Sequence, residues 1–333
     1  MKKFIWIGIV IGILICTGPV FGEKIAEFDE LKKPTDLLLL KDNLYIMDSA
    51  SVLVFDKKSG AYKFKFARQG EGPGEIKISP FLTNTLTLHR NRIAIDSLDR
   101  IIYYSPDGKF IEEKKKGRFL ALQVKPIANH FVVKGIDRSN KKEEYIILSV
   151  YNNKMEKIKE IARQKSNIQL NAVTLIADSL HFAVLNNRIY VENSTEGFVI
   201  DVFDKSGNRI DSIRHKKRNL RVTEKDRIDA MERYKNDSLV KQFGFEKLKS
   251  RLTFIYGKTF PEIQDIMTYG DKIVVKTHQQ KQNKVEYHII DSKGALLKTL
   301  YLPKTWEGEM IAHLNGVEPK LFQFYNGFFY YLT

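Results

Sequence analysis

The chain has 333 residues and a formal net charge of +15, from 55 lysines and arginines against 40 aspartates and glutamates. This excess of positive charge gives the protein a basic surface, which favours anionic partners. The export predicted below argues against nucleic acid as the partner. Cys16 is the only cysteine and lies near the N-terminus, so disulfides and cysteine-ligated metals are excluded. The chain of about 310 residues that follows the N-terminal segment at 1–22 therefore needs an ordinary hydrophobic core.

The N-terminus has the features of a secretory signal peptide at residues 1–22. Lys2 and Lys3 precede an apolar run at 4–16, and the pattern at 20–22 fits a cleavage site. The run is shorter than the about 20 residues that a membrane-spanning helix needs. We therefore expect an exported protein, periplasmic or extracellular. Two less favoured alternatives are anchoring through the uncleaved segment and lipidation of Cys16, against which the bulky Ile15 argues.

A repeat runs through the remaining chain. Its first half is a polar turn followed by an apolar strand that commonly ends on an acidic residue: NLYIMD at 43–48, NRIAID at 91–96 and NRIYVE at 187–192, with weaker copies at 129–133, 271–275 and 326–330. Its second half is a hairpin: VFDKKSG at 54–60, YYSPDG at 103–108, VFDKSG at 202–207, IIDSKG at 289–294 and a glycine-free VYNN at 150–153. Asp and Ser start such turns, and Gly closes them at positive φ.

These units predict an all-β fold, a six-bladed β-propeller of four-stranded antiparallel blades over residues 23–333. The sixth unit, at 321–332, is incomplete. We expect the N-terminal strand at 24–28 to close this last blade.

A short helical insertion is expected at about 222–258, between blades four and five. Thr223 and Asp226 resemble a helix-capping pair, and Asp237 or Ser238 is placed to cap a second helix that ends near Gly244.

The glycine-rich segment RQGEGPGE at 68–75 is expected to connect two blades rather than to bind phosphate, because Pro73 and Gly74 interrupt any helix and the glutamates repel anions. This segment, the repeated strands and hairpins, and the TEKD and FPEI motifs at 223–226 and 260–263 resemble exported bacterial six-bladed β-propeller proteins related to NHL-type repeats. The resemblance implies the fold strongly and the function weakly, since its members range from binding scaffolds to metal-dependent lyases.

Metal-binding candidates are weak. Asp48, Asp96 and Glu192 end equivalent strands and are interpreted as caps of the following turns, with one calcium ion as the alternative. His130 and His181 lie near blade starts and are the best candidates for a zinc site built from different blades.

Two basic clusters are the candidate binding surface. They comprise Lys114, Lys115, Lys116 and Arg118, and Lys216, Lys217, Arg218 and Arg221. Each follows an outer hairpin strand and is read first as a solvated loop, and otherwise as a contact with an anionic envelope surface.

The sequence contains no catalytic motif, so we predict a monomeric, non-enzymatic scaffold that presents a protein- or glycan-binding face. The alternative is a metal-dependent lyase or hydrolase with its site in the central channel of the propeller.

Overall fold

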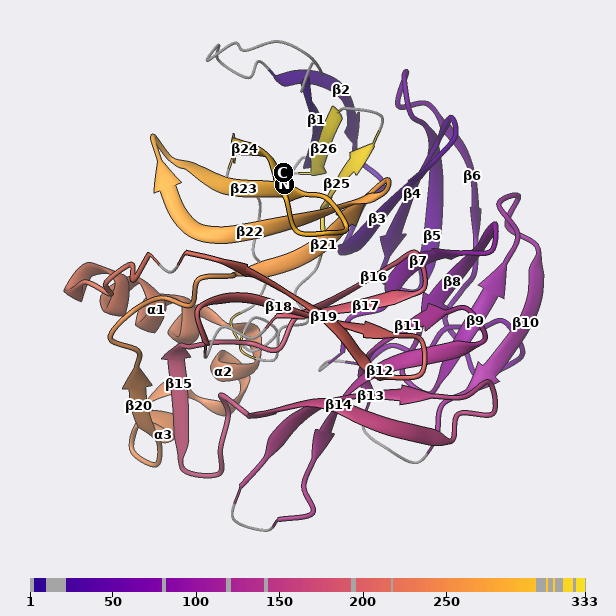
Figure 1. Ribbon diagram of the computed structural model, residues 1–333. Coiled ribbons are helices and arrows are strands. Elements are labelled where there is room, and N and C mark those ends of the chain that lie inside the picture. The colour runs from indigo at the N-terminus through magenta and orange to yellow at the C-terminus, as the bar shows by residue number, and fades with distance from the viewer. Residues whose placement is uncertain are drawn as a thin grey trace. The chain divides into compact units, whose positions relative to one another are not determined.

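The computed structural model describes residues 3–9, 22–79, 82–117, 121–140, 143–192, 196–216, 218–303, 310, 314, 320–325 and 328–332 (Figure 1). Cys16 and most of the predicted cleavage site lie outside these residues. The chain forms two compact units, one of residues 1–117, 302–306 and 319–333, and one of residues 118–301 and 307–318. Among the residues described, no helix is both long and apolar enough to span a membrane.

The first unit contains three four-stranded antiparallel sheets. Two of them follow the chain, and the third joins both chain ends in the order β2-β1-β26-β25. The strands are β1 (Lys3–Ile9), β2 (Gly22–Phe28), β3 (Pro34–Leu40), β4 (Asn43–Asp48), β5 (Ser51–Asp56), β6 (Tyr62–Phe66), β7 (Thr85–His89), β8 (Arg92–Asp96), β9 (Arg100–Tyr104), β10 (Phe110–Lys115), β25 (Phe322–Tyr325) and β26 (Phe328–Leu332).

The second unit contains three more four-stranded antiparallel sheets, each in chain order. Their strands are β11 (Ala121–Ile127), β12 (His130–Asp137), β13 (Tyr145–Tyr151), β14 (Lys157–Lys165), β16 (Phe182–Leu185), β17 (Arg188–Glu192), β18 (Phe198–Asp204), β19 (Arg209–His215), β21 (Asp265–Tyr269), β22 (Lys272–Lys281), β23 (Lys284–Ile290) and β24 (Leu296–Pro303). Among the described residues there are six four-stranded sheets, which equals the number of units that the sequence repeat predicts.

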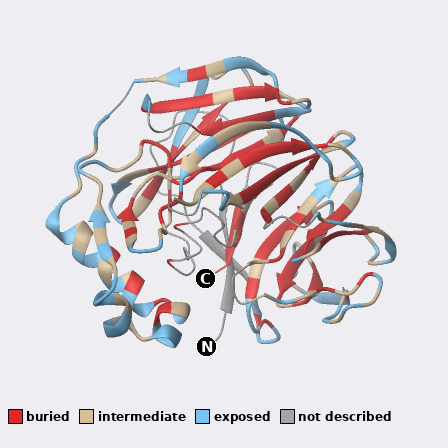
Figure 2. Ribbon diagram, turned by 90° about the horizontal axis from the view of Figure 1, so that it is seen from below, coloured by how far each residue is buried: buried red, intermediate tan, exposed pale blue. Residues whose placement is uncertain are grey.

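In the five sheets that follow the chain order, the middle strands are mostly buried and the fourth strands are mostly exposed (Figure 2). Every residue of β9, RIIYY, is buried, whereas β10, FIEEKK, has none that is. Strands covered on both faces have continuous apolar runs, while a strand with water on one side carries charges. The burial therefore follows from the alternation of apolar and charged strands in the repeat.

The glycines of the predicted hairpins lie against the outer strand of the preceding sheet. Gly108, at φ +82°, would place an added Cβ 2.9 Å from the Cβ of Phe66 on β6. Gly207, at φ +84°, would place one 2.8 Å from Ile161 Cγ2 on β14. Each hairpin glycine thus serves two purposes, since it closes its own turn and lets that turn contact the neighbouring sheet.

The sheet that joins the chain ends differs in one respect from the expectation. The N-terminus does contribute strands to the last sheet, as predicted, and the predicted segment 24–28 lies in β2. However, the strand that pairs directly with β26 is β1, from Ile5 opposite Leu332 to Ile9 opposite Phe328. This strand lies inside the predicted signal peptide, and β2 pairs with β1 as the outer strand.

The helical insertion follows β19, between the fourth and fifth sheets in chain order, as predicted. Its helices are α1 (Glu224–Asn236), α2 (Ser238–Phe243) and α3 (Phe245–Lys249). Thr223 and Asp226 form the predicted capping box, and Asp237 caps α2. The two ends of the insertion are held together by backbone hydrogen bonds from the N–H of Val222 to the carbonyl of Lys258 (3.1 Å) and from the N–H of Phe260 to the carbonyl of Leu220 (2.8 Å).

The insertion and the segment before β16 together form a small subdomain with a parallel sheet that the sequence repeat does not predict. β15 (Ala172–Ile176) pairs with β20 (Thr253–Tyr256), and α1 packs on β15. Tyr234 of α1 and Leu175 of β15 are both almost fully buried in the core of this subdomain.

Candidate functional site

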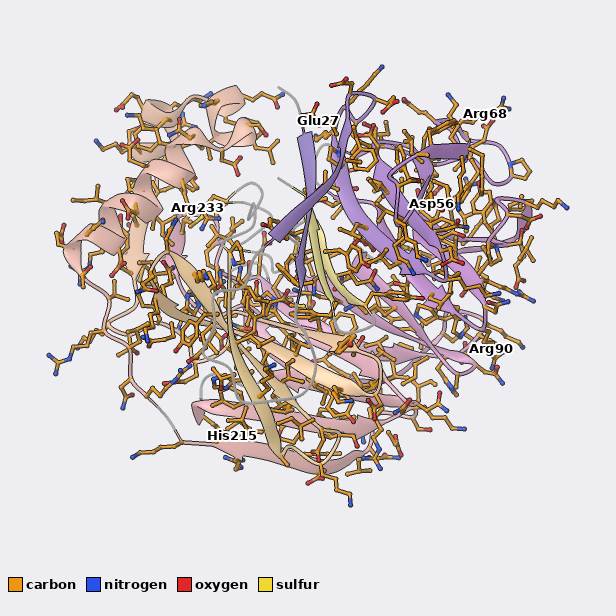
Figure 3. All side chains as sticks on the ribbon, turned by 90° about the horizontal axis from the view of Figure 1, so that it is seen from above. Glu27, Asp56, Arg68, Arg90, His215 and Arg233 are labelled. Atoms are coloured by element: carbon orange, nitrogen blue, oxygen red, sulfur yellow. The ribbon has the colours of Figure 1, made fainter. Side chains whose placement is uncertain are left out.

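The glycine-rich loop at 68–75 connects β6 to β7 and is closed by its own glutamate. Glu75 accepts hydrogen bonds from the backbone N–H of Gly72 (2.8 Å) and from Arg68 Nε (2.8 Å). Arg68 itself lies at the margin of the unit in Figure 3. A phosphate would need the backbone amides of such a loop, but the Glu75 carboxylate already accepts from the Gly72 amide. The loop is therefore a structural connector, as the sequence predicts.

The acidic residues that end the second strands act differently from the expectation. Asp48 accepts hydrogen bonds from the backbone N–H of Lys32 (2.9 Å) and Lys33, just before β3. Glu192 likewise accepts from the N–H of His181 (3.0 Å), just before β16. Asp48 and Glu192 thus hold the segment that leads into the first strand of their own sheet, a role that the prediction of turn caps did not include.

Asp96, at the equivalent position, pairs with a lysine of the first predicted basic cluster. Lys116 Nζ contacts the Asp96 carboxylate and donates a hydrogen bond to the backbone carbonyl of Ser97 (2.5 Å). The side chain of Lys116 is only 4% exposed. Lys116 is therefore a buried structural cation, and the expectation that it belongs to a solvated binding surface does not hold.

A cluster of buried ionisable groups surrounds the end of β17. His181 Nδ1 lies 3.4 Å from Asp265 Oδ1, and His181 Nε2 lies 4.0 Å from Glu192 Oε1. Burial raises the pKa of Glu192 well above its usual 4.5, and the negative charge of Asp178 raises it further. Lys134, which is fully buried, acts in the opposite direction. This environment favours a protonated, neutral Glu192.

The two predicted metal-binding histidines show no common site. His181 belongs to the carboxylate cluster, while His130 begins β12 with its Nδ1 buried and without a hydrogen-bond partner among the described residues. In the part of the chain that the structure describes, no three His, Asp or Glu side chains are arranged to hold a metal ion.

Arg218, from the second predicted basic cluster, binds two buried glutamates. Its Nη1 lies 2.5 Å from Glu286 Oε2, and its backbone N–H donates to Glu262 Oε1 at 2.8 Å. The N–H of Asn219 donates to the same oxygen at 2.8 Å. These contacts fix the loop that leads from β19 into the insertion.

Glu286 is the centre of this polar cluster. Thr277 Oγ1 donates to it at 2.8 Å and Tyr301 Oη at 3.1 Å, while His288 Nε2 lies 3.1 Å away. Burial alone would raise the pKa of Glu286, but hydrogen bonds from His288, Arg218 and Thr277 outweigh it and lower the pKa to about 2. The cluster therefore holds a charged carboxylate.

What remains of the two basic clusters is a smaller surface than the sequence suggests. Lys115, Lys216 and Arg221 are exposed and Lys114 is half-buried. Arg118 and Lys217 lie outside the described residues.

The insertion and the loop before β15 carry exposed apolar side chains that the sequence analysis did not identify. Four large apolar side chains are exposed there: Leu170 (89%), Ile228 (56%), Phe243 (55%) and Ile255 (45%). They come from the loop before β15, α1, α2 and β20, and Figure 3 marks α1 by Arg233. Exposed apolar groups on loops and helices attached to a β scaffold are typical of contact surfaces. The pairing of β15 with β20 joins the segments that carry Leu170 and Ile255, about 80 residues apart in the sequence, which a local pattern does not reveal.

Comparison with known proteins gives the family context. A family model described as a 6-bladed beta-propeller matches residues 27–259, which is more than half of the chain. No curated protein matches the sequence.

Several solved structures resemble this chain at low sequence identity. They include an exported-protein candidate from Bacteroides fragilis NCTC 9343, with 14% identity, a TM-score of 0.47 and coverage of 82% of this chain and 72% of that one. The Pan2 WD40 domain of Neurospora crassa has 9% identity and a TM-score of 0.40, covering 81% and 66%. Hydrazine synthase of Kuenenia stuttgartiensis has 13% identity and a TM-score of 0.41, covering 84% and 70%. These similarities are too low to bear on function.

Proposed function

Because the chain belongs to the family of six-bladed β-propellers, as its repeats predict, we propose that it is a non-enzymatic scaffold whose insertion, residues 222–258, binds a protein or glycan. The observation that carries this proposal is the group of exposed apolar side chains on and beside the insertion. Isolated exposed apolar residues are ordinary, but four of them in one small subdomain favour a contact surface.

The buried polar clusters support a structural reading of the rest of the chain. Arg218, Lys116 and Glu75 each bind partners within the protein, and these bonds fix loops between strands. The alternative of a metal-dependent lyase or hydrolase lacks a candidate ligand set among the described residues. A metal analysis of the purified protein, with thermal melting before and after chelation, tests that alternative.

The scaffold proposal is tested by changing the surface rather than by deleting the insertion, because deletion would expose the apolar side chains of β15. We expect Leu170→Ser with Phe243→Ser to abolish retention of partners from an envelope extract, quantified by mass spectrometry. The matched control is Phe110→Ser with Leu297→Ser, two exposed apolar residues on outer strands. Unchanged retention by the first variant, or equal loss in both variants, would refute the proposal.

We further propose export, on the strength of the predicted signal peptide. N-terminal sequencing of the protein recovered from cells tests it, since cleavage gives a chain that begins at residue 23.

A further inference from the structure

β20 is an edge strand with one unused side. Thr253 N–H donates to Asn171 at 2.9 Å and Gly257 N–H to Ile176 at 3.0 Å, so these amides face β15. Successive residues of a strand present their amides to opposite edges. The N–H groups of Phe254 and Tyr256 therefore point away from β15, and β20 has no second neighbouring strand within the described residues. Figure 1 shows β20 on the outer side of β15.

The sequence of β20 lacks the charge and the proline that often protect an edge strand, and the register shift in its pairing with β15 lies on β15, between Thr174 and Ile176. Proteins commonly shield an edge strand with lysine, proline or a bulge. β20 reads TFIY, which contains neither a charge nor a proline, and Ile255 is 45% exposed. Within the part of the chain that the structure describes, the edge of β20 is thus open to another extended chain.

The surroundings of β20 are strongly basic. Residues 239–258 contain five basic side chains, Lys241, Lys247, Lys249, Arg251 and Lys258, and one acidic side chain, Glu246. All five are exposed, and none forms an ion pair within the described part of the chain. On α1, by contrast, Arg227 and Lys235 pair with Glu224 and Glu232. Arg251 and Lys258 stand on either side of β20, which spans about 13 Å.

We propose that the edge of β20 binds an extended acidic peptide, which adds to the β15–β20 sheet as a third strand. This inference rests on the proposed function and names the partner class of the insertion. Backbone hydrogen bonds to the amides of Phe254 and Tyr256 give affinity, and acidic residues at both peptide ends meet Arg251 and Lys258. A second copy of this chain fits poorly because it would present the same basic flanks.

The test uses the acetylated, amidated peptide EEVTVTVTEE with a fluorescent label and measures anisotropy. A second peptide has the same sequence with N-methyl groups on alternate residues, which keeps its charge and removes strand donors. We expect N-methylation to weaken binding at least about tenfold, as should Arg251→Glu with Lys258→Glu. The control Lys115→Glu with Lys216→Glu changes the net charge equally and should alter binding less than about twofold.

Two results would overturn the proposal. Equal binding of both peptides shows that charge alone acts, and a stronger response to anionic vesicles than to the peptide identifies a lipid surface instead. Absence of peptide binding also refutes strand addition, but leaves the scaffold proposal intact if Leu170→Ser with Phe243→Ser still loses the natural partner. Retention of that partner by the Leu170 and Phe243 variant refutes the scaffold proposal separately.

Discussion

Replacing Gly294 by alanine tests whether the hairpin glycines determine how neighbouring sheets pack. Gly294 closes the β23–β24 turn at φ +90° and lies against Ile213 of β19, the outer strand of the preceding sheet. An added Cβ would lie 2.6 Å from Ile213 Cγ2 and 2.8 Å from Cγ1. Ile213 is buried, and His215 Nε2 contacts the Gly294 carbonyl at 3.0 Å, so neither side moves freely.

The expected cost has two parts. An L-residue with positive φ costs about 1 to 2 kcal/mol. Crowding a packed core with an additional methyl group costs about 1 to 3 kcal/mol more. We therefore expect Gly294→Ala to lower the free energy of unfolding by about 3 kcal/mol.

Urea unfolding followed by circular dichroism measures this cost, and Gly270→Ala is the matched control. Gly270 also has positive φ, +57°, but an added Cβ would find nothing within 4 Å. The control should therefore cost only about 1 kcal/mol.

A double-mutant cycle isolates the contact. In an Ile213→Ala background the crowding is largely removed, so Gly294→Ala should cost about as little as Gly270→Ala. The reasoning is refuted if Gly294→Ala is no more destabilising than the control, or if its cost is unchanged when Ile213 is truncated.

Three further predictions concern buried charges. Lys116→Ala should lower the free energy of unfolding in urea by about 3 kcal/mol, because it removes the cation that pairs with the buried Asp96 carboxylate. The exposed Lys115→Ala should change the free energy of unfolding by less than about 0.5 kcal/mol. Equal effects of the two substitutions would contradict the burial of the Lys116–Asp96 pair. The pKa of Glu286 is about 2 when folded against an ordinary 4.5, so the advantage of wild type over Glu286→Gln, about 3 kcal/mol, should hold above about pH 5 and vanish toward about pH 2; an advantage undiminished at about pH 2 would be inconsistent with it. The raised pKa of Glu192 means that wild type loses stability as the pH rises above 4.5, and Glu192→Gln should remove this loss; parallel melting temperatures between about pH 5 and about pH 8 would exclude it.

The repeat made much of the fold predictable because its signals are local. A turn such as VFDKSG at 202–207 is specified by its own residues: Asp204 binds the turn amides and Gly207 supplies positive φ. The capping box at Thr223 is equally local. Such elements need no knowledge of distant segments.

The candidate site could not be predicted because its contacts are long-range. Arg218 and Glu286 are 68 residues apart, and the pairing of β15 with β20 joins segments on either side of a complete sheet. In the sequence, Lys116 and Lys115 are neighbours of the same type. Only the direction of each side chain separates the buried cation from the exposed one.

If the predicted signal peptide is cleaved, the make-up of the last sheet depends on this cleavage, because β1 lies within the peptide. In the uncleaved chain, β1 lies between β2 and β26 and provides hydrogen bonds to both. Removal of the signal peptide would take away this middle strand, so that β2 and β26 would no longer be joined through β1. The precursor and the processed form would then differ in the hydrogen bonding of β26, and hydrogen exchange at Tyr330 and Tyr331 would report the change.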